Sequence, residues 1–304
     1  MALGGLRFHL VDVFADARFR GNPLAVVEDC DALGDAQMLE IAREFNLSET
    51  VFLQSPLDPI NTARARIFTP ASELPFAGHP TLGAAAVLAR TRAADALARY
   101  GVVIALEEAA GVLNCDAGSG RAGAVYVEFA SPAPPQKLGE PPPQADLARA
   151  LSLDAGDIGF DAHAPSIWSA GAPFVFAPLR SRAALERARR EPEAFAAAAG
   201  TAAGVFLYTS ETLDERAAIC ARMFANGLGF EEDPATGSAA AAFAGAAHEF
   251  ENPDDGEHRI FIEQGHMIGR PSRITLRMEI EGGRLSGVHV GGQVVFVAEG
   301  VLTI

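Results

Sequence analysis

A proline-rich run near the middle of this 304-residue chain limits what the chain can fold into. Proline fixes φ and lacks the backbone amide donor, so residues 131–143 can form neither a helix nor a central strand. Since a chain of this length is expected to hold two domains, we interpret the run as a linker. We predict an N-terminal domain at residues 1–130 and a C-terminal domain at residues 144–292, with residues 293–304 returning as a strand that completes the first domain.

Charge and hydropathy narrow the class of protein. The chain carries 39 acidic and 24 basic side chains, which argues against a nucleic-acid partner because phosphates require clustered lysine and arginine. It has no apolar run of the roughly 18 residues that a membrane helix needs, and residues 1–20 lack the basic-then-apolar pattern of a signal peptide. We therefore expect a cytoplasmic protein without a membrane partner.

Residues that usually hold cofactors are scarce. Lys137 is the only lysine and lies in the proline-rich run, which argues against a Schiff-base lysine for pyridoxal phosphate. Neither a P-loop nor a G-x-G-x-x-G motif after a strand is present. The histidines show no metal-binding spacing, and the cysteines are widely spaced: Cys30, Cys115 and Cys220. We expect no cofactor and no metal, and we interpret the cysteines as small core residues.

Four short segments recur in the same order, 150 to 156 residues further along the chain. The pairs are Gly21–Pro23 with Gly171–Pro173, Val51–Leu53 with Val205–Leu207, Arg66–Phe68 with Arg222–Phe224, and Pro80–Ala84 with Pro234–Ser238. This repetition predicts two halves built on one plan, related by a pseudo-twofold axis and facing each other across a cleft.

Local patterns on both sides of the linker predict an α/β chain. Runs of β-branched and aromatic residues predict strands, and alanine-rich stretches after prolines predict helices. The predicted strands include Val51–Leu53, Val125–Phe129, Val205–Tyr208 and Arg259–Ile262. Met38, Ile41 and Phe45 recur at helical spacing, which predicts a helix over Asp35–Phe45.

Two predicted helix starts are the most informative features for function. In each, a proline, Pro80 or Pro234, stands where the first helical residue is expected, because its fixed φ suits that position. His79 and Asp233 then occupy the cap positions. Unpaired backbone amides and the positive end of the helix dipole suit such sites to a carboxylate or an enolate without lysine or arginine.

Both helix starts also allow a purely structural interpretation, since Asp-Pro and an early serine or threonine are common there. Thr236 and Ser238 fall within about the first turn of the second helix. Gly83 and Gly237 each follow the proline by three residues. Because glycine lowers helix stability by about 1 kcal/mol, we interpret both as places that another group approaches closely. The paired occurrence favours a site for a small anionic molecule.

Glu49 is the candidate for a catalytic base. It lies between the predicted helix that ends at Phe45 and the strand that begins at Val51, and the repeat places Ala203 at the equivalent position. An acid without a counterpart in the repeat is typical of a single proton-shuttling base, and burial would raise its pKa so that it could take and return a proton. The alternative is a structural role, in which Asn46-x-x-Glu49 is a capping box or a solvated turn acid.

Segments in order along residues 11–272 resemble the phenazine-biosynthesis (PhzF-like) isomerase family, within the diaminopimelate-epimerase-like fold. They are Val11–Phe14 with Gly21–Val26, Asn46–Thr50, Pro75–Thr81, Glu232–Ser238, and Glu263–Gly265 with Gly269–Ser272. The resemblance implies an α/β (α+β) chain of two pseudosymmetric domains, each a curled mixed β-sheet around a central α-helix. It also implies an interdomain site, no cofactor and a homodimer.

The same resemblance makes Glu49 the general acid/base and places His79 and Asp233 beside the substrate. It assigns substrate binding to Gly78, Thr236, Gly237 and Ser238. In the phenazine enzyme the reaction isomerises trans-2,3-dihydro-3-hydroxyanthranilate: a proton leaves C3 and returns at C1, and the resulting enol becomes a ketone. We therefore expect a cofactor-independent isomerase that moves a proton between carbons of a small carboxylate substrate.

Two other functions remain open. One is a racemase or epimerase of an amino or hydroxy acid, which needs a base on each face of one carbon. Epimerases of this fold use two cysteines at the helix starts, where this chain has His79 and Asp233 instead. The other is a non-catalytic interaction protein that retains the fold, against which the intact acid, histidine and aspartate argue.

Overall fold

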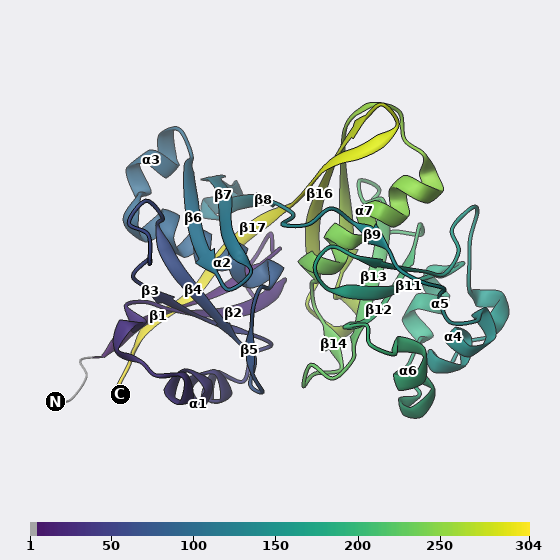
Figure 1. Ribbon diagram of the computed structural model, residues 1–304, viewed down its shortest axis with the longest axis horizontal. Coiled ribbons are helices and arrows are strands. Elements are labelled where there is room, and N and C mark those ends of the chain that lie inside the picture. The colour runs from purple at the N-terminus through teal and green to yellow at the C-terminus, as the bar shows by residue number, and fades with distance from the viewer. Residues whose placement is uncertain (1–4) are drawn as a thin grey trace. The chain divides into compact units, whose positions relative to one another are not determined.

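The computed structural model describes residues 5–304, which divide into two units (Figure 1). The first unit comprises the described residues up to Ala130 together with Gly291–Ile304, and the second comprises Ser131–Val290. The proline-rich run therefore belongs to the second unit and is not a separate linker. Its Gln136–Lys137 step lies between prolines and keeps its amides, so it forms a short strand, β9, that pairs with β10 (Ser166–Ser169).

The first unit is a mixed sheet that closes on itself. Its elements are β1 (Leu6–Val13), β2 (Asn22–Val27), η1 (Cys30–Ala32), α1 (Asp35–Phe45), β3 (Thr50–Gln54), β4 (Ala63–Phe68), β5 (Glu73–Leu74), α2 (Gly78–Arg92), α3 (Ala94–Arg99), β6 (Val102–Glu108), β7 (Gly111–Ser119), η2 (Arg121–Gly123), β8 (Val125–Ala130) and the last part of β17 (Arg284–Leu302). The strands pair in the order β1, β2, β3, β4, β6, β7, β8 and β17, and β17 pairs again with β1. The ring of pairings leaves an interior for one helix.

That helix is α2, whose residues from Gly78 to Ala89 are all buried. It contacts strands from around the ring, including β1, β2, β6 and β8. Its small residues allow this close packing, because a side chain on Gly83 would meet Leu24 Cδ2 at 2.3 Å and Val13 Cγ2 at 3.2 Å. The close approach expected at Gly83 therefore comes from the unit's own sheet and not from a ligand.

The second unit repeats the combination of mixed sheet and buried helix. Its elements are β9, α4 (Gln144–Ala150), η3 (Ala155–Asp157), β10, β11 (Pro173–Pro178), α5 (Arg182–Arg187), α6 (Pro192–Ala199), β12 (Gly204–Thr209), β13 (Ile219–Ala225), β14 (Glu232–Asp233), α7 (Gly237–Glu251), β15 (Gly256–Gln264), η4 (His266–Ile268), β16 (Ser272–Glu281) and the first part of β17. Parallel pairs join β11 to β12 and β13 to β15, and the other registers are antiparallel.

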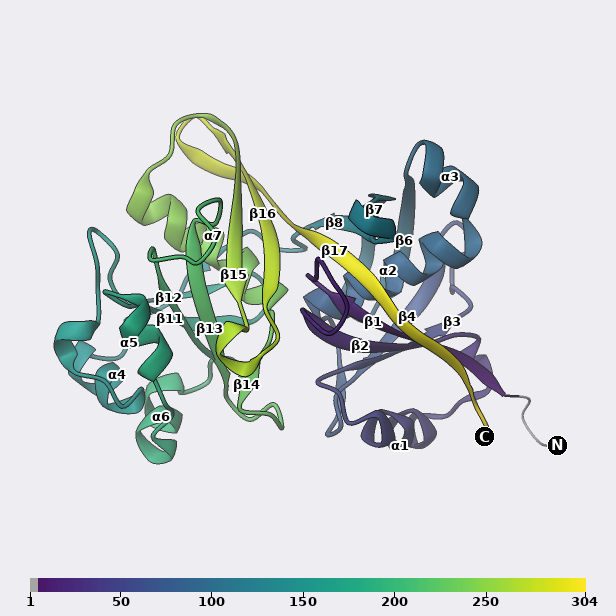
Figure 2. The same ribbon diagram turned by 180° about the vertical axis from the view of Figure 1, so that it is seen from behind.

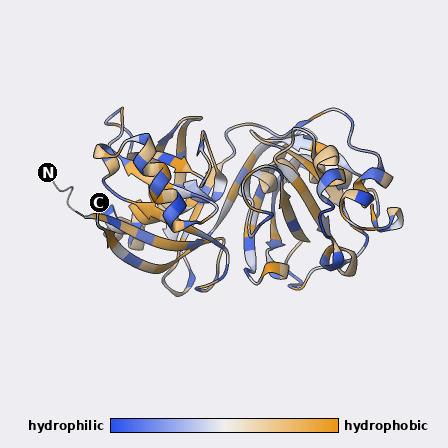
Figure 3. Cartoon of the chain, turned by 90° about the horizontal axis from the view of Figure 1, so that it is seen from below, coloured by the Kyte–Doolittle hydropathy of each residue, from blue (hydrophilic) through white to orange (hydrophobic). Residues whose placement is uncertain are grey.

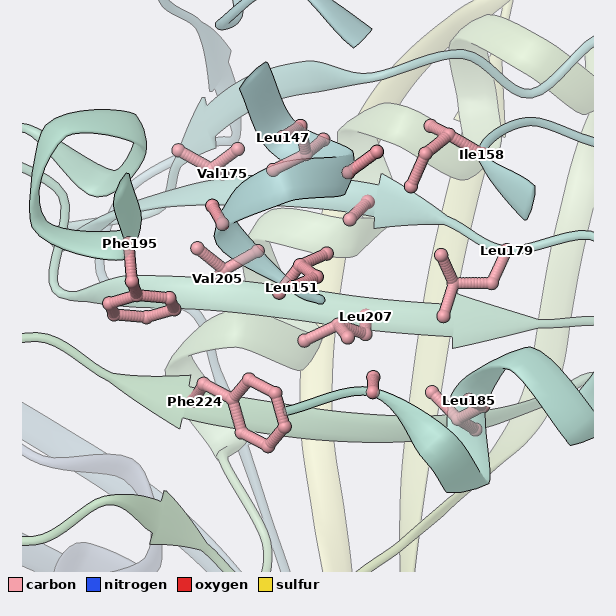
Figure 4. Packing of buried hydrophobic residues seen from close by; sticks show 14 of the residues in the cluster. Leu147, Leu151, Ile158, Val175, Leu179, Leu185, Phe195, Val205, Leu207 and Phe224 are labelled. Atoms are coloured by element: carbon pink, nitrogen blue, oxygen red, sulfur yellow. The ribbon is translucent and has the colours of Figure 1, made fainter. Parts of the chain in front are cut away.

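Two apolar cores hold the second unit together. One surrounds α7, where Phe243 is fully buried and packs against the rings of Phe176, Phe206 and Tyr208. The other lies between α4, α5 and α6 and the outer face of β11, β12 and β13; Figure 4 shows Leu151, Val205 and other members of this cluster. Figure 3 shows that many residues along the strands of each unit are hydrophobic.

One strand, β17, is shared by the two units (Figure 2). It leaves β16 through the turn Gly282–Gly283, where both glycines have positive φ (58° and 70°). Its residues up to Val290 belong to the second unit and those from Gly291 onward to the first, where it pairs with β1 from Val13↔Val294 to Leu6↔Leu302.

The helix and the strands predicted by name from local sequence are confirmed. The helix α1 has the predicted bounds, and the four predicted strands lie within β3, β8, β12 and β15. The three cysteines are free and buried, as expected of core residues. Among residues 5–304 no helix is long and apolar enough to cross a membrane, and no cluster of three or more histidine, cysteine or acidic side chains has metal-binding geometry.

Candidate active site

Glu49 occupies a turn between α1 and β3 in the first unit. Asn46 ends α1 in the left-handed conformation (φ 51°), and its amide binds the carbonyl of Ala42. Asn46 therefore closes a helix, which rules out the capping-box interpretation of Asn46-x-x-Glu49. Although it lies in a turn, Glu49 is only 8% exposed, so its carboxyl group is largely removed from water.

His79 lies beside this carboxyl group. Its Nε2 atom is 3.4 Å from Oε2 of Glu49, and the residue is 4% exposed. The position differs from the predicted cap, because α2 begins at Gly78 with Ala77 as N-cap, which makes His79 the second helical residue and Pro80 the third. Proline is tolerated throughout the first turn, where no amide has a partner within the helix, so it could not fix the first position.

Asn22 determines which ring nitrogen of His79 carries the proton. Its Nδ2 atom lies 3.2 Å from Nδ1 of His79, and an amide nitrogen can only donate. Burial lowers the pKa of His79 to about 3, so the ring is neutral and carries a single proton. Since Nδ1 accepts the bond from Asn22, the proton is on Nε2 and faces the carboxyl group of Glu49. The contact is thus the close approach of a neutral ring to a buried carboxyl group and not an ion pair.

We predict that Asn22→Asp changes the tautomer of His79. A carboxylate at this position accepts from Nδ1 and favours the Nδ1–H form, which leaves Nε2 without a proton toward Glu49. We expect the ¹⁵N shifts of the His79 ring to exchange their assignments and kcat to fall by about 10²-fold, the lower end of what a positioned acid or base contributes. Asn226→Asp is the matched control, since Asn226 donates to the carbonyls of Gly200 and Ala202 in the other unit. Unchanged ring shifts in Asn22→Asp would contradict the assignment.

Asp233 is held by a hydrogen-bonded turn in the second unit. Thr236 Oγ1 donates to Oδ2 of Asp233 at 2.6 Å. Gln264 donates to the Asp233 carbonyl at 2.8 Å and to Thr236 Oγ1 at 3.0 Å, and its Oε1 accepts from the Thr236 amide at 3.1 Å. Asp233 itself is buried. The carboxyl group and the start of α7 are therefore fixed to the end of β15.

The structure corrects the predicted cap of this helix as well. Thr236 is the N-cap of α7, whereas Asp233 lies in β14, paired with Met223 of β13. The ladder with β13 fixes the backbone of Asp233 in an extended form, so Pro234 follows a strand and does not open a helix. Gly237 and Ser238 are the first two helical residues and precede the first bond of the helix, from the Ala240 amide to the Thr236 carbonyl at 3.0 Å.

The run Glu263–Ser272, which contains two of the segments that carry the family resemblance, forms the support of Asp233. Gly265 has a φ of 79°, and a side chain there would meet the carbonyl oxygens of Arg270 at 2.3 Å and Pro234 at 2.6 Å. The sequence alone assigns no role of its own to Asn22 or to Gln264, which support His79 and Asp233. The signal for both was present in the motif segments Gly-Asn-Pro and Glu-Gln-Gly.

The chain has extensive similarity to known proteins. The family model described as "Phenazine biosynthesis-like protein" matches residues 11–300. An uncharacterized isomerase of Mesorhizobium japonicum is 44% identical over 97% of this chain and 98% of that protein. The trans-2,3-dihydro-3-hydroxyanthranilate isomerase of Pseudomonas aeruginosa is 36% identical over 97% of this chain and 98% of that protein. A Bacillus anthracis protein of the PhzF family has the same mixed α/β fold, with a TM-score of 0.88 at 26% identity, covering 99% of this chain and 100% of that chain.

Proposed function

We propose, since this chain belongs to the phenazine biosynthesis-like (PhzC-PhzF) family and is an isomerase of that family, that it moves a proton between two carbon atoms of a small anionic substrate. The observation that carries the proposal is the buried contact between Glu49 and the neutral imidazole of His79. Loss of a proton from carbon is slow unless a base is close and the charge left behind meets preorganised donors.

The proposed roles follow from the chemistry of each group. Glu49 takes the proton from one carbon and returns it to another. His79, with its proton on Nε2, donates a hydrogen bond to the carboxyl group of Glu49 or to the substrate as charge shifts between them. Asp233 is proposed to bind the polar edge of the substrate. The remaining proposed binding residues lie at the two helix starts: Gly78, Thr236, Gly237 and Ser238.

We propose a cyclic, unsaturated carboxylate as substrate, of the class to which trans-2,3-dihydro-3-hydroxyanthranilate belongs. The 36% identical relative that is named for this substrate supports the class. In such a ring, removal of a proton from C3 leaves an anion delocalised over the conjugated ring, return of the proton at C1 gives an enol, and the enol becomes the ketone. Backbone amides at the start of a buried helix suit the carboxylate of this substrate because they supply positive potential without a basic side chain.

Turnover in deuterated water is the test of the proposed reaction. The purified protein is incubated with trans-2,3-dihydro-3-hydroxyanthranilate, and product formation and the positions of deuterium are followed by NMR. Formation of the isomer, with hydrogen returned at C1, supports the proposal. Deuterium exchange at a single carbon with inversion of configuration, measured on enantiomers of amino and hydroxy acids, would instead indicate a racemase or epimerase. Lack of turnover and of binding by any small carboxylate would favour a non-catalytic protein.

We also propose that the two units are built on one plan, as the sequence repetition predicts. Equivalent hydrogen bonds support this proposal. Arg66 forms a bidentate pair with Glu73, and Arg222 forms the same pair with Glu232. The turns before β4 and β13 are likewise each closed by a glutamate that accepts from two successive amides: Glu107 from Leu57 and Asp58, and Glu263 from Leu213 and Asp214.

A further inference from the structure

A second buried carboxyl group, which the proposed reaction does not use, lies under the start of α2. Glu108 is the last residue of β6 and is 8% exposed. Its Oε1 atom lies 2.6 Å from the hydroxyl oxygen of Thr81, in the first turn of α2. Its Oε2 atom is buried and has no hydrogen-bond partner among the described residues. An ionised carboxylate in such a position would be poorly compensated.

The number of hydrogens at Thr81 indicates the state of this group. The Thr81 hydroxyl oxygen is also 2.8 Å from the carbonyl oxygen of Ala77, the N-cap of α2. A hydroxyl has one hydrogen and can donate it to only one of these two acceptors. Both contacts are satisfied when Glu108 is a carboxylic acid, which donates its own proton to Thr81 while Thr81 donates to Ala77. If Glu108 were a carboxylate, its Oε1 atom and the carbonyl oxygen of Ala77 would compete for the single hydroxyl hydrogen of Thr81.

The second unit contains a comparable chain of bonds, from a side chain at the end of a strand to a threonine at the start of the buried helix, with an unambiguous donor. Gln264 follows the turn-closing Glu263 as Glu108 follows Glu107. The Gln264 amide donates to the hydroxyl of Thr236, which in turn donates to Asp233. An amide nitrogen in this position always donates. A carboxyl group can take the same place only when it is protonated.

The surroundings of Glu108 agree with the neutral form. The titratable or charged groups on the elements packed against β6 are His79, Arg90 and Arg92 on α2, Arg64 and Arg66 on β4, and Cys115 and Asp116 on β7. His79 is neutral, Arg64 acts on Glu107, and Arg66 is bound by Glu73 and Asp35. Arg90 and Arg92 belong to the last turn of α2. Burial raises the pKa of Glu108 to about 8, with the Thr81 hydroxyl acting in the opposite direction.

We propose that Glu108 is a positioning residue that acts as a protonated acid, donating through Thr81 to the N-cap carbonyl of α2 and so holding the first turn that presents His79 to Glu49. This proposal rests on the proposed function, since it assigns Glu108 a role in the isomerase site. Ionisation would redirect the Thr81 hydroxyl toward Glu108 and withdraw it from Ala77. It would also place a negative charge near the amides proposed to bind an anionic substrate. Activity should therefore fall as Glu108 loses its proton above about pH 8.

The proton on Glu108 can be tested without any substrate. A carboxyl group whose pKa is raised in the folded state keeps its proton while the unfolded chain loses it, so stability falls as the pH rises toward 8 and is then constant. Glu108→Gln, whose amide donates as the acid does, removes this dependence. We expect the Tm of Glu108→Gln minus that of the wild type to increase between about pH 5 and pH 8 and then to level off. The control Glu107→Gln should show a constant difference over this range, because its amide contacts lower the pKa of Glu107. A constant difference for Glu108→Gln as well would overturn the proposal.

The positioning role is tested by the pH dependence of turnover. Wild-type kcat/KM should decline above about pH 8, whereas Glu108→Gln should stay active into the alkaline range. Glu108→Ala and Thr81→Val should reduce kcat about 10- to 100-fold at neutral pH, and Thr81→Ser, which restores the hydroxyl, should recover it. An alkaline decline that persists in Glu108→Gln would overturn the positioning role. If instead the wild type turns over no carboxylate, the proposed function fails while the Tm difference still decides whether Glu108 holds its proton.

Discussion

Replacing Glu49 by glutamine is expected to lower kcat by about 10²- to 10⁴-fold, the range that a positioned general acid/base contributes. Glutamine has nearly the same shape as glutamate but cannot accept a proton from carbon. The side chain is buried beside His79, so a neutral amide is tolerated there and the fold should be retained. Binding of a substrate analogue should be nearly unchanged, because the loss concerns proton transfer and not the contacts that hold the substrate. Steady-state kinetics and calorimetric titration of the same preparation measure both quantities.

Glu44→Gln is the matched control for this variant. Glu44 is an exposed residue of α1, five positions before Glu49. Its replacement by glutamine removes one negative charge, as Glu49→Gln does. It should keep wild-type kcat and affinity. If Glu49→Gln retains wild-type turnover, Glu49 is not the base, whatever substrate is used. A parallel loss of affinity and of Tm would show instead that the carboxyl group has a structural role.

The largest effect on stability is expected for Gly265→Ala. The residue has a φ of 79°, which costs a side chain about 1–2 kcal/mol. In addition, the new Cβ atom would lie 2.3 Å and 2.6 Å from two backbone carbonyl oxygens, of Arg270 and Pro234, which cannot rotate away as a side chain can. Overpacking adds about 1–3 kcal/mol, so the free energy of unfolding should fall by roughly 2–5 kcal/mol. Displacement of Pro234 should also disturb the adjacent Asp233 and reduce turnover.

Gly269→Ala separates the two causes. Gly269 has a φ of 73° in the same turn, but a side chain there would meet nothing within 4 Å. This variant should lose only the about 1–2 kcal/mol of the left-handed conformation. Chemical denaturation of both variants gives the difference directly. Equal losses would show that the turn relaxes without strain and that contact with Pro234 does not hold Asp233 in place.

Much of this fold could be predicted from local sequence, because its elements follow from local periodicity. The bounds of α1 agree with the spacing of Met38, Ile41 and Phe45, and the strands follow the β-branched runs. Glu49 could be placed in a turn for the same reason. The helix starts could not be fixed in this way. Proline permits several positions in a first turn, which leaves the start of α2 open at Pro80, and Pro234 is kept outside α7 by the ladder of β14 with β13, which is a tertiary contact.

The motif segments mark Asn22 and Gln264, but the roles of the supporting residues could not be predicted because they depend on partners distant in sequence. Asn22 binds His79 across 57 residues, and Gln264 binds Thr236 across 28. Glu108 meets Thr81 across 27 residues. Periodicity contains no information on such pairs, and a Gly-Asn-Pro segment has a sufficient explanation as a turn. For Gly83 the sequence predicts a close approach correctly, but it cannot show whether a ligand or a strand of the same unit makes that approach.

The division of β17 between the units has a consequence for synthesis of the protein. The second unit is inserted within the first, whose final strand is synthesised only after the second unit. The second unit has all of its residues once Val290 has emerged, whereas the edge of β1 that pairs with β17 stays open until Leu302 has been made. The unit that is begun first is therefore completed last, and a nascent chain released before residue 291 would expose the apolar edge of an open sheet.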